Sequence, residues 1–556
     1  MHKHSTSGLT APSHFAFDAV VIGSGFGGGT LALRLTQAGK RVLVLERGRR
    51  WRGQNIPAAA APGGSHPFPA LGDDRFFWGR RLWDPRRQRL GLFDVRQFLN
   101  LQGVMAAGVG GGSLIWTNVV IEAPADVFTE HWPKDVTRST LEPYYKKAEQ
   151  YLRPAFVPGT PGIGSATTPI KRVTLLKEAA ECVGKPWRPV RVAVNFSDES
   201  EPSPNGFGQA QQLGCNFCAR CAAGCPQNAK NTVDLSYIAE AESLGAEVRT
   251  LHRVCHIAAL ANGYRVYFER FNLDGQLVER DYIDAAKVIL AAGTFGTTEL
   301  LLKSKMPGLL PNLSAALGTR LSINGNVLSG AIRKSTAVDG ASRRAADNPD
   351  RGTAIASMID YGNFVVEDFA NPAWAAGIVG GTNFGRIAAF VKALLGVKVR
   401  ERERQEDLLV YVGVGRDRAR GRMFLNALGQ LNWRWPGGIG AEPVVRELHA
   451  AMAELARVQG RDYVPNVFSI FNRPVIYHPL GGCPMADTAQ TGVVDSLGRV
   501  YGYPGLYIAD GSIVPTALGR NPAFTIAALA ERIAEHAVRQ WDCTGAPAQL
   551  TVSPRS

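Results

Sequence analysis

The sequence predicts an α/β protein with two interleaved domains, one of them built on a buried parallel sheet. A glycine-rich turn joins a buried strand to a helix near the N-terminus, and a second strand–glycine–helix unit follows near residue 290. The chain has 556 residues, enough for two substantial cores. Its 45% hydrophobic and 20% charged residues are typical of a globular protein. We expect no membrane-spanning helix, because no apolar run reaches about 18 residues.

The first unit is a β-strand, a helix and a second strand. Residues 17–22 are almost entirely apolar, as expected for a strand buried on both faces of a parallel sheet. A helical segment covers 30–38 and stops at Gly39, and the second strand covers 41–45. The segment therefore has the length of a βαβ unit.

The turn of this unit carries a dinucleotide fingerprint, Gly23-x-Gly25-x-x-Gly28, and Glu46 closes the second strand. Glycines allow the backbone to approach a pyrophosphate, a helix N-terminus attracts it, and a carboxylate can accept hydrogen bonds from a ribose. The alternative is a tight turn without a ligand. The strand at 287–294, which enters a glycine turn and a helix through 302, favours FAD over NAD. We therefore predict a Rossmann-like FAD-binding domain.

The remaining segments alternate between two domains. We expect a surface excursion over 50–100, helices near 140–152, 173–183 and 231–244, a strand at 247–250, and a hairpin of 265–271 with 276–282 around Asp274-Gly275. The resulting division is an FAD-binding domain of 16–125, 226–318 and 475–540, a substrate-binding domain of 126–225 and 319–474, and a tail of 541–556.

The formal net charge is +14. It indicates either a basic surface without a specific partner or affinity for anionic membranes. Nucleic-acid binding is not expected, because the arginines are scattered. The N-terminus lacks an apolar signal core, which favours a cytoplasmic protein. Residues 386–400 form an amphipathic pattern, interpreted as a helix packed on its own domain or as a membrane-resting lid.

Four of the eight cysteines fall within eleven residues, with the spacing of a bacterial ferredoxin half-site: Cys215, Cys218, Cys221 and Cys225, followed by Pro226. One iron–sulfur cluster is the first interpretation. A zinc or other structural metal, and plain thiols or a redox disulfide, are the alternatives. With a cluster, electrons would leave to a downstream acceptor, and the protein would be a dehydrogenase or an electron-transfer flavoprotein.

Several motifs together resemble the glucose–methanol–choline (GMC) oxidoreductases and, within them, the cholesterol oxidase-like branch. They are Gly23–Gly28 with Glu46-Arg47-Gly48, Gly108–Leu114, Ala229–Thr232, Ala291–Thr294, Tyr477–Cys483, Ala509–Ser512 and Asn521-Pro522. The resemblance covers about 16–540. It implies an FAD domain interleaved with an α+β substrate domain on an antiparallel sheet.

The resemblance also implies the site. His478 and Asn521 would cap the flavin and position an alcohol, whose carbinol hydrogen leaves as hydride to flavin N5. Whether His478 is the base or a positioning group stays open. The residues expected near FAD are Gly23, Gly25, Phe26, Gly28, Glu46, Arg47, Gly110, Gly111, Gly112, Ser113, Asn118, Val254, Ala292, Gly293, Asp510, Gly511, Asn521 and Pro522.

Two further residues bear on the substrate. Glu367 stands where sterol oxidases of this branch carry a proton-shuttling glutamate, and an ordinary strand-end acid is the alternative. Trp116-Thr117-Asn118 departs from the Asn-Gly-Gly of sterol oxidases, and a tryptophan there would narrow the pocket or stack on the substrate. We therefore expect a bulky apolar alcohol as substrate, with O2, a quinone or an electron-transfer protein as acceptor.

Overall fold

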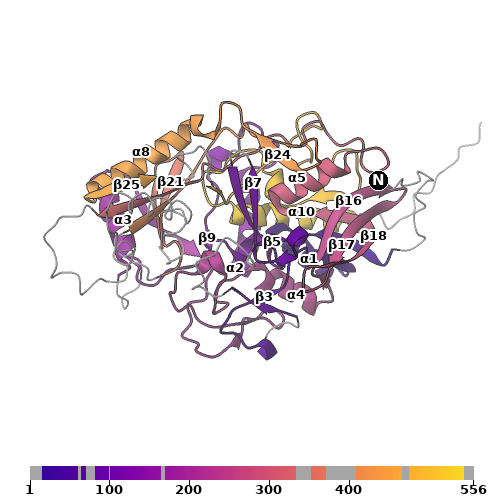
Figure 1. The fold of residues 1–556 in the computed structure, drawn as a ribbon, viewed down its shortest axis with the longest axis horizontal. Coiled ribbons are helices and arrows are strands. Elements are labelled where there is room, and N and C mark those ends of the chain that lie inside the picture. Colours follow the sequence, from indigo (N-terminus) through magenta and orange to yellow (C-terminus); the bar gives the residue numbers. More distant parts are fainter. Residues whose placement is uncertain are drawn as a thin grey trace, which may run out of the picture.

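The computed structural model describes residues 15–60, 64–69, 82–98, 101–163, 169–333, 352–370, 408–465 and 475–543. It confirms the predicted α/β class, with a mixed sheet containing parallel strands and an antiparallel sheet as its two largest sheets (Figure 1). The amphipathic segment 386–400 lies outside the described residues. Among the helices that are described, none combines the length and apolar content needed to cross a bilayer.

The first sheet holds five parallel strands whose chain ranks run 3-2-1-4-5, the order of dinucleotide-binding sheets. Across the sheet they are β15 (Glu247–Arg249), β2 (Val42–Leu45), β1 (Phe17–Ile22), β18 (Leu277–Leu290) and β27 (Leu506–Ile508). All four residues of β2 are buried, as expected between two layers.

The strand β18 belongs to two arrangements at once. Its first half pairs antiparallel with β17 (Gly263–Phe271), which in turn pairs with β16 (His252–Leu260). Its last residues pair in parallel with β1 and β27. The second strand of the predicted hairpin, 276–282, and the predicted buried strand at 287–294 are therefore parts of one continuous strand of 14 residues, which ends at Leu290.

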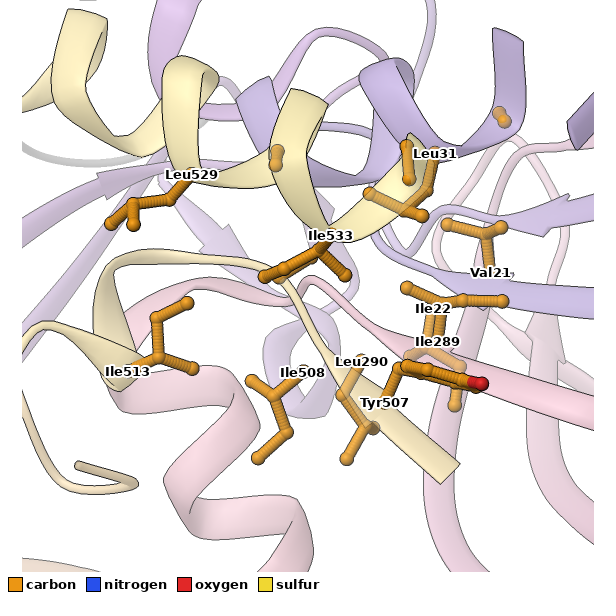
Figure 2. Close-up of a cluster of buried hydrophobic side chains, with 14 of the residues drawn as sticks. Val21, Ile22, Leu31, Ile289, Leu290, Tyr507, Ile508, Ile513, Leu529 and Ile533 are labelled. Atoms are coloured by element: carbon orange, nitrogen blue, oxygen red, sulfur yellow. The ribbon is translucent and has the colours of Figure 1, made fainter. Parts of the chain in front are cut away.

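Helices α1 (Phe26–Gln37) and α10 (Ala523–Cys543) lie together on one side of this sheet (Figure 2). Leu31 from α1 and Ile533 from α10 are fully buried against strand side chains such as Ile289. Helix α5 (Gly293–Ser304) follows β18 directly. Helices α2 (Arg138–Leu152) and α4 (Tyr237–Ser243) pack on α10 and α1 respectively.

The second sheet is antiparallel and has six strands. Helices α3 (Lys171–Cys182) and α8 (Pro443–Val458) cover the face that carries Val366. Val365 points to the other face, where it clusters with Val412 and Val414. Because side chains alternate along a strand, Glu367 shares the face of Val365. The strands, in spatial order, are β11 (Trp187–Pro189), β20 (Ser357–Asp360), β21 (Phe364–Phe369), β22 (Leu408–Gly415), β19 (Val327–Arg333) and β25 (Arg461–Pro465).

The described residues between 50 and 98 contain short strands that sequence periodicity cannot detect. Leu92 and Phe93 are almost fully buried. Strand β8 pairs with β26 just before His478, so this segment supports the site. The strands within this range are β3 (Trp51–Arg52), β4 (His66–Pro67), β5 (Trp83–Asp84), β6 (Arg89–Leu90) and β7 (Phe93–Phe98); β7 pairs with β8 (Leu101–Ala106), which in turn pairs with β26 (Val475–Ile476).

The helix predicted over 231–244 is shorter in the structure. A 3-10 turn covers Val233–Leu235, and α4 begins only at Tyr237. The amide of Asn231 donates to the carbonyl of Leu152 at 2.9 Å, so this residue serves a contact between segments instead of a helix. The other short strands are β9 (Val119–Val120), β10 (Ala155–Phe156), β12 (Arg191–Val192), β13 (Ser203–Pro204), β14 (Gln211–Gln212), β23 (Arg422–Leu425) and β24 (Leu431–Arg434).

Candidate active site

The fingerprint glycines bring the start of α1 close to two strand ends. A Cβ on Gly27 would lie 1.3 Å from the carbonyl oxygen of Ala509, and one on Gly28 would lie 2.0 Å from that of Gly23. Gly23 has φ +95°, which favours glycine. The backbone N–H groups at this helix start therefore stand at the carboxyl ends of β1, β18 and β27, where doubly wound sheets bind their ligands.

Glu46 already holds this turn. One carboxylate oxygen accepts from the Ser24 hydroxyl at 2.7 Å, and the other accepts from the Gly48 N–H at 2.9 Å. The first oxygen also accepts from the Ser24 N–H at 3.3 Å, so the oxygen bonded to Gly48 is the one that keeps a lone pair for a ribose hydroxyl. The neighbouring Arg47 is paired with Asp94 at 2.6 Å. In the structure both residues therefore have a supporting role, in addition to the predicted cofactor contacts.

The second glycine segment meets the first one. A Cβ on Gly111 would lie 2.7 Å from the Cα of Gly25, so the two backbones touch. Phe26, the first residue of α1, contacts Trp116 edge-on at 4.9 Å between ring centroids. Gly112 is exposed and has open space around it. The segment thus offers a bare backbone surface beside the fingerprint turn.

The hydroxyl of Ser113 donates to the Gly110 carbonyl at 2.7 Å and accepts from the Val233 N–H at 3.0 Å. Asn118 has φ +68° and is fully buried, yet neither polar atom of its amide has a partner. The indole N–H of Trp116 is likewise buried and unpartnered. Buried polar atoms are normally satisfied, so these fit a bound polar group such as a flavin.

The far side of the candidate cofactor site is arranged by Asp510. Its carboxylate accepts from the Gly293 N–H at 2.9 Å, the Thr297 hydroxyl at 2.5 Å and the Ser512 N–H at 2.8 Å. It thereby fixes the start of α5 against the loop after β27. The buried Ser512 hydroxyl lacks a partner and fits a bound ligand. The other predicted residues lie at Ala292 before α5, Gly511 after Asp510, Pro522 before α10 and Val254 at a bulge in β16.

The structure brings Glu367 and Asn521 together. The Asn521 amide nitrogen lies 3.4 Å from one carboxylate oxygen of Glu367. The second carboxylate oxygen and the Asn521 amide oxygen are buried without a partner. Glu367 is fully buried, and burial raises its pKa to about 8. A carboxyl group with this pKa exchanges protons close to neutral pH.

His478 joins this group through its neighbour Tyr477. The two rings contact at 4.8 Å, and the Tyr477 hydroxyl is buried without a hydrogen-bond partner. The charge of Glu367 contributes to raising the pKa of Tyr477, after burial itself, which indicates that the two side chains are close. Burial lowers the pKa of His478 to about 3, so its imidazole is neutral at working pH.

Asn326 fixes the tautomer of His478. Its amide oxygen accepts from the backbone N–H of His478 at 2.9 Å and of Tyr477 at 3.3 Å. The amide nitrogen must therefore face His478 Nδ1, 3.1 Å away, and can only donate to it. Since Nδ1 accepts, the ring proton of the neutral imidazole is on Nε2.

Sequence analysis missed the role of Asn326. The available signal was Asn324-Gly325-Asn326, a turn pattern following an apolar segment. Asn324 and Gly325 do adopt left-handed φ values of +51° and +57°. That pattern indicates a turn but not what its amides contact, since His478 lies 152 positions away.

The four clustered cysteines line one small cavity together with Lys230. Burial raises the pKa of Cys215, Cys218 and Cys225, the last to about 11, so these thiols are protonated at neutral pH when no metal is bound. In the described part of the chain, no group of three or more His, Cys, Asp or Glu residues is arranged to hold a metal ion. The structure thus gives the predicted iron–sulfur cluster no support.

Lys230 occupies the centre of this region. Its ammonium donates to the carbonyls of Cys221 at 2.7 Å, Leu114 at 3.0 Å and Trp116 at 3.1 Å. The cysteine segment is thereby tied to the second glycine segment.

Comparison with known proteins places the chain among flavoenzymes. A family model described as GMC oxidoreductase matches residues 17–322, and a second with the same description matches 441–530. Cholesterol oxidase of Acinetobacter baumannii is 29% identical over 568 residues, covering 94% of each chain. A long-chain-alcohol oxidase of Arabidopsis thaliana is 23% identical, covering 92% of this chain and 65% of that protein.

The solved structure of pyridoxine 4-oxidase from Mesorbium loti superposes with a TM-score of 0.56 and 14% sequence identity. The match covers 94% of this chain and 99% of that one. At this identity the likeness concerns the fold alone.

Proposed function

Because this chain belongs to the GMC oxidoreductase family and is thus an FAD-dependent alcohol oxidase or dehydrogenase, we propose that its substrate is a bulky apolar alcohol, sterol-like or long-chain. The observation that carries the proposal is the buried polar group formed by Glu367, Asn521 and Tyr477. Each has one unpartnered oxygen, and all three lie beside an apolar sheet face. A hydroxyl on a large apolar molecule can form hydrogen bonds with these unpartnered oxygens.

The role of each residue follows from whether its side chain can donate or accept a hydrogen bond or a proton. The bound FAD would supply the hydride acceptor for the carbinol hydrogen. We propose that His478 Nε2–H donates to the substrate oxygen and that Asn521 fixes the same oxygen. An imidazole with a pKa near 3 is a weak base, so we propose that the hydroxyl proton passes to Glu367 in its ionised form, which is the minor form below its pKa of about 8. For a sterol, Glu367 is also suited to move a proton between carbons when a double bond shifts into conjugation.

The substrate class is supported by the sheet face and by the relatives. Val365, Val412 and Val414 are buried on the face that carries Glu367, so an apolar body would find matching surface there. The relatives named above act on a sterol and on long-chain alcohols, as their names state. For Trp116 we retain both proposed roles: it would narrow the pocket or stack on the substrate.

We propose O2 as acceptor, because these relatives are named oxidases. The iron–sulfur dehydrogenase stays the alternative, with a quinone or a protein as acceptor. We further propose the domain division given above and a cytoplasmic protein that contacts membranes peripherally, the latter supported by the net charge of +14.

The test is anaerobic stopped-flow bleaching of the bound flavin by cholesterol, a long-chain primary alcohol and ethanol. We expect bleaching by one or both apolar alcohols and not by ethanol. His478→Ala and Asn521→Leu should slow it by roughly 100-fold or more while FAD stays bound. His478→Gln should slow bleaching less than His478→Ala does, because a glutamine amide also offers an N–H donor.

The matched control is His536→Ala, which removes a half-buried imidazole on α10 and should react like the wild type. Wild-type rates in His478→Ala and Asn521→Leu would contradict the assigned roles. Bleaching by ethanol alone would contradict the substrate class.

A further inference from the structure

The turn Ser322–Asn326, called here the 322–326 turn, lies inside the protein in a conformation that needs support. Ser322, Ile323 and Asn324 are fully buried. Asn324 and Gly325 have left-handed φ values, and a Cβ on Gly325 would lie 2.6 Å from the Gly415 carbonyl oxygen. Left-handed backbone at a non-glycine residue persists when surrounding contacts impose it.

One amide of this turn holds the backbone just before Asn521. The side-chain oxygen of Asn324 accepts from the N–H groups of Leu518 and Gly519, both at 2.9 Å. Its side-chain nitrogen donates to the carbonyl of Arg520 at 2.8 Å. The Asn324 side chain therefore holds three consecutive backbone positions that lead directly into Asn521.

The other amide of the turn, that of Asn326, holds His478 and selects its tautomer, as described above. His478 and Asn521 are far apart in the sequence and come from different segments. The 322–326 turn is thus a shared support, because both members of the pair are held by amides two positions apart.

Asp417 holds the turn itself. One carboxylate oxygen accepts from the Ser322 hydroxyl at 2.9 Å, the Gly325 N–H at 3.0 Å and the Ile323 N–H at 3.1 Å. The other oxygen accepts from the Ala419 N–H at 2.8 Å. Three donors therefore converge on one carboxylate oxygen, and a fourth donor occupies the other oxygen. A proton on either oxygen would compete with these donors, so the arrangement favours the ionised carboxylate.

We propose that Asp417 is a positioning residue for the reaction: its ionised carboxylate holds the 322–326 turn so that Asn324 and Asn326 align Asn521 and His478. The proposal rests on the function proposed above. It predicts that neutralising Asp417 disturbs the alignment of the pair without removing a group that touches substrate or FAD.

Protonation of Asp417 should have the same effect. Burial raises its pKa to about 6, and the nearby Glu442 carboxylate adds to the rise, while the hydrogen bonds lower it. Arg416 and Arg418 flank Asp417 in the chain but pair with Asp126 and Glu442 respectively. The turnover number should therefore fall as the pH drops through about 6.

The first experiment examines the imidazole directly, in the holoenzyme labelled with 15N-histidine. The wild type should show a His478 ring protonated at Nε2, assigned by its loss in His478→Ala. Asp417→Asn should shift or broaden this signal, since an asparagine turns an N–H2 group or a single oxygen toward the donors. This readout does not depend on the substrate, so it tests the proposal even if the substrate class is wrong.

The second experiment is steady-state kinetics. Asp417→Asn should lower kcat by roughly 10- to 100-fold, with KM and FAD content changed little, and its acid limb near pH 6 should disappear. Asp234, whose pKa is also raised to about 6, is intact in this variant, so the lost limb belongs to Asp417. Ser322→Ala, which removes one of the hydrogen bonds, should act in the same direction but more weakly.

The matched control is Asp495→Asn, because Asp495 also accepts from two backbone N–H groups in a turn, those of Leu497 and Arg499. It should leave the His478 signal and kcat unchanged. A wild-type signal and kcat in folded Asp417→Asn would overturn the proposal. If that variant does not fold, a wild-type signal and pH profile in Ser322→Ala would do so.

Discussion

At the scale of single residues, Glu367 carries the most unusual chemistry. It is a carboxyl group placed on a sheet face among valines, with one hydrogen bond of 3.4 Å and one oxygen without a partner. Removing an ionised carboxylate from water is costly, which is why burial raises its pKa to about 8. The same environment that destabilises the charge suits Glu367 to proton transfer.

This placement predicts a pH-dependent stability. In the unfolded chain Glu367 ionises near pH 4.5, whereas in the folded protein it stays protonated up to about pH 8. Its raised pKa therefore stabilises the fold below pH 4.5, and this contribution is lost as pH rises to about 8, by roughly 3–5 kcal/mol. Glu367→Gln should be more stable than the wild type above pH 8, with the difference shrinking toward pH 4.5.

Urea unfolding of holoenzyme at several pH values measures this difference. Glu199→Gln, at an exposed glutamate, serves as control and should follow the wild type at each pH. A stability difference between Glu367→Gln and the wild type that does not change with pH would contradict a raised pKa of Glu367 in the folded protein.

At the scale of secondary-structure elements, the start of α1 combines packing with binding. Gly27→Ala would drive a methyl group into the Ala509 carbonyl, so the free energy of unfolding should fall by roughly 3–5 kcal/mol. Gly112→Ala meets no protein atom within 4 Å and should leave the stability of the apoprotein unchanged. If Gly112 faces the cofactor as predicted, the same change should weaken FAD binding.

Thermal unfolding of the apoprotein and FAD titration distinguish the two glycines. A Gly112→Ala protein that binds FAD like the wild type would remove Gly112 from the cofactor site.

Elements were predictable where their signal is local. The strand at 17–22 and the helix near 140–152 follow from continuous apolar residues and from periodicity, and both are observed. The strands at 51–52 and 66–67 could not be predicted, because two residues carry no period. The late start of α4 depends on Asn231, whose side chain bonds to a segment almost eighty positions away.

At the scale of the whole molecule, the electron acceptor is the open chemical choice, and the names of the relatives support the proposal of O2 over an iron–sulfur relay. Aerobic turnover should release one H2O2 per alcohol oxidised. If the four clustered cysteines are plain thiols, protein purified anaerobically should contain no acid-labile sulfide. Stoichiometric iron and sulfide, with slow H2O2 release, would favour the dehydrogenase instead.

The predicted site depends on the resemblance as much as on residue chemistry. His478, Asn521 and Glu367 were predicted from motifs. The structure places Asn521 beside Glu367 and the chain neighbour of His478, Tyr477, within reach of the Glu367 charge, and the catalytic roles stay predictions. Asn326 and Asp417 could not be predicted. They act through hydrogen bonds spanning more than 90 positions, and a lone Asn or Asp carries no signal of such a partner.

Strand β18 has a consequence for how the protein is made. One of its edges is completed by β27, which lies within the last tenth of the chain, and the α1 face is covered by α10, which comes later still. During translation the first two hundred or more residues of the nucleotide fold therefore leave the ribosome with an open sheet edge and bare apolar surface. The nascent chain is therefore exposed to aggregation until β27 and α10 have emerged, because the sheet edge and the α1 face are covered only then.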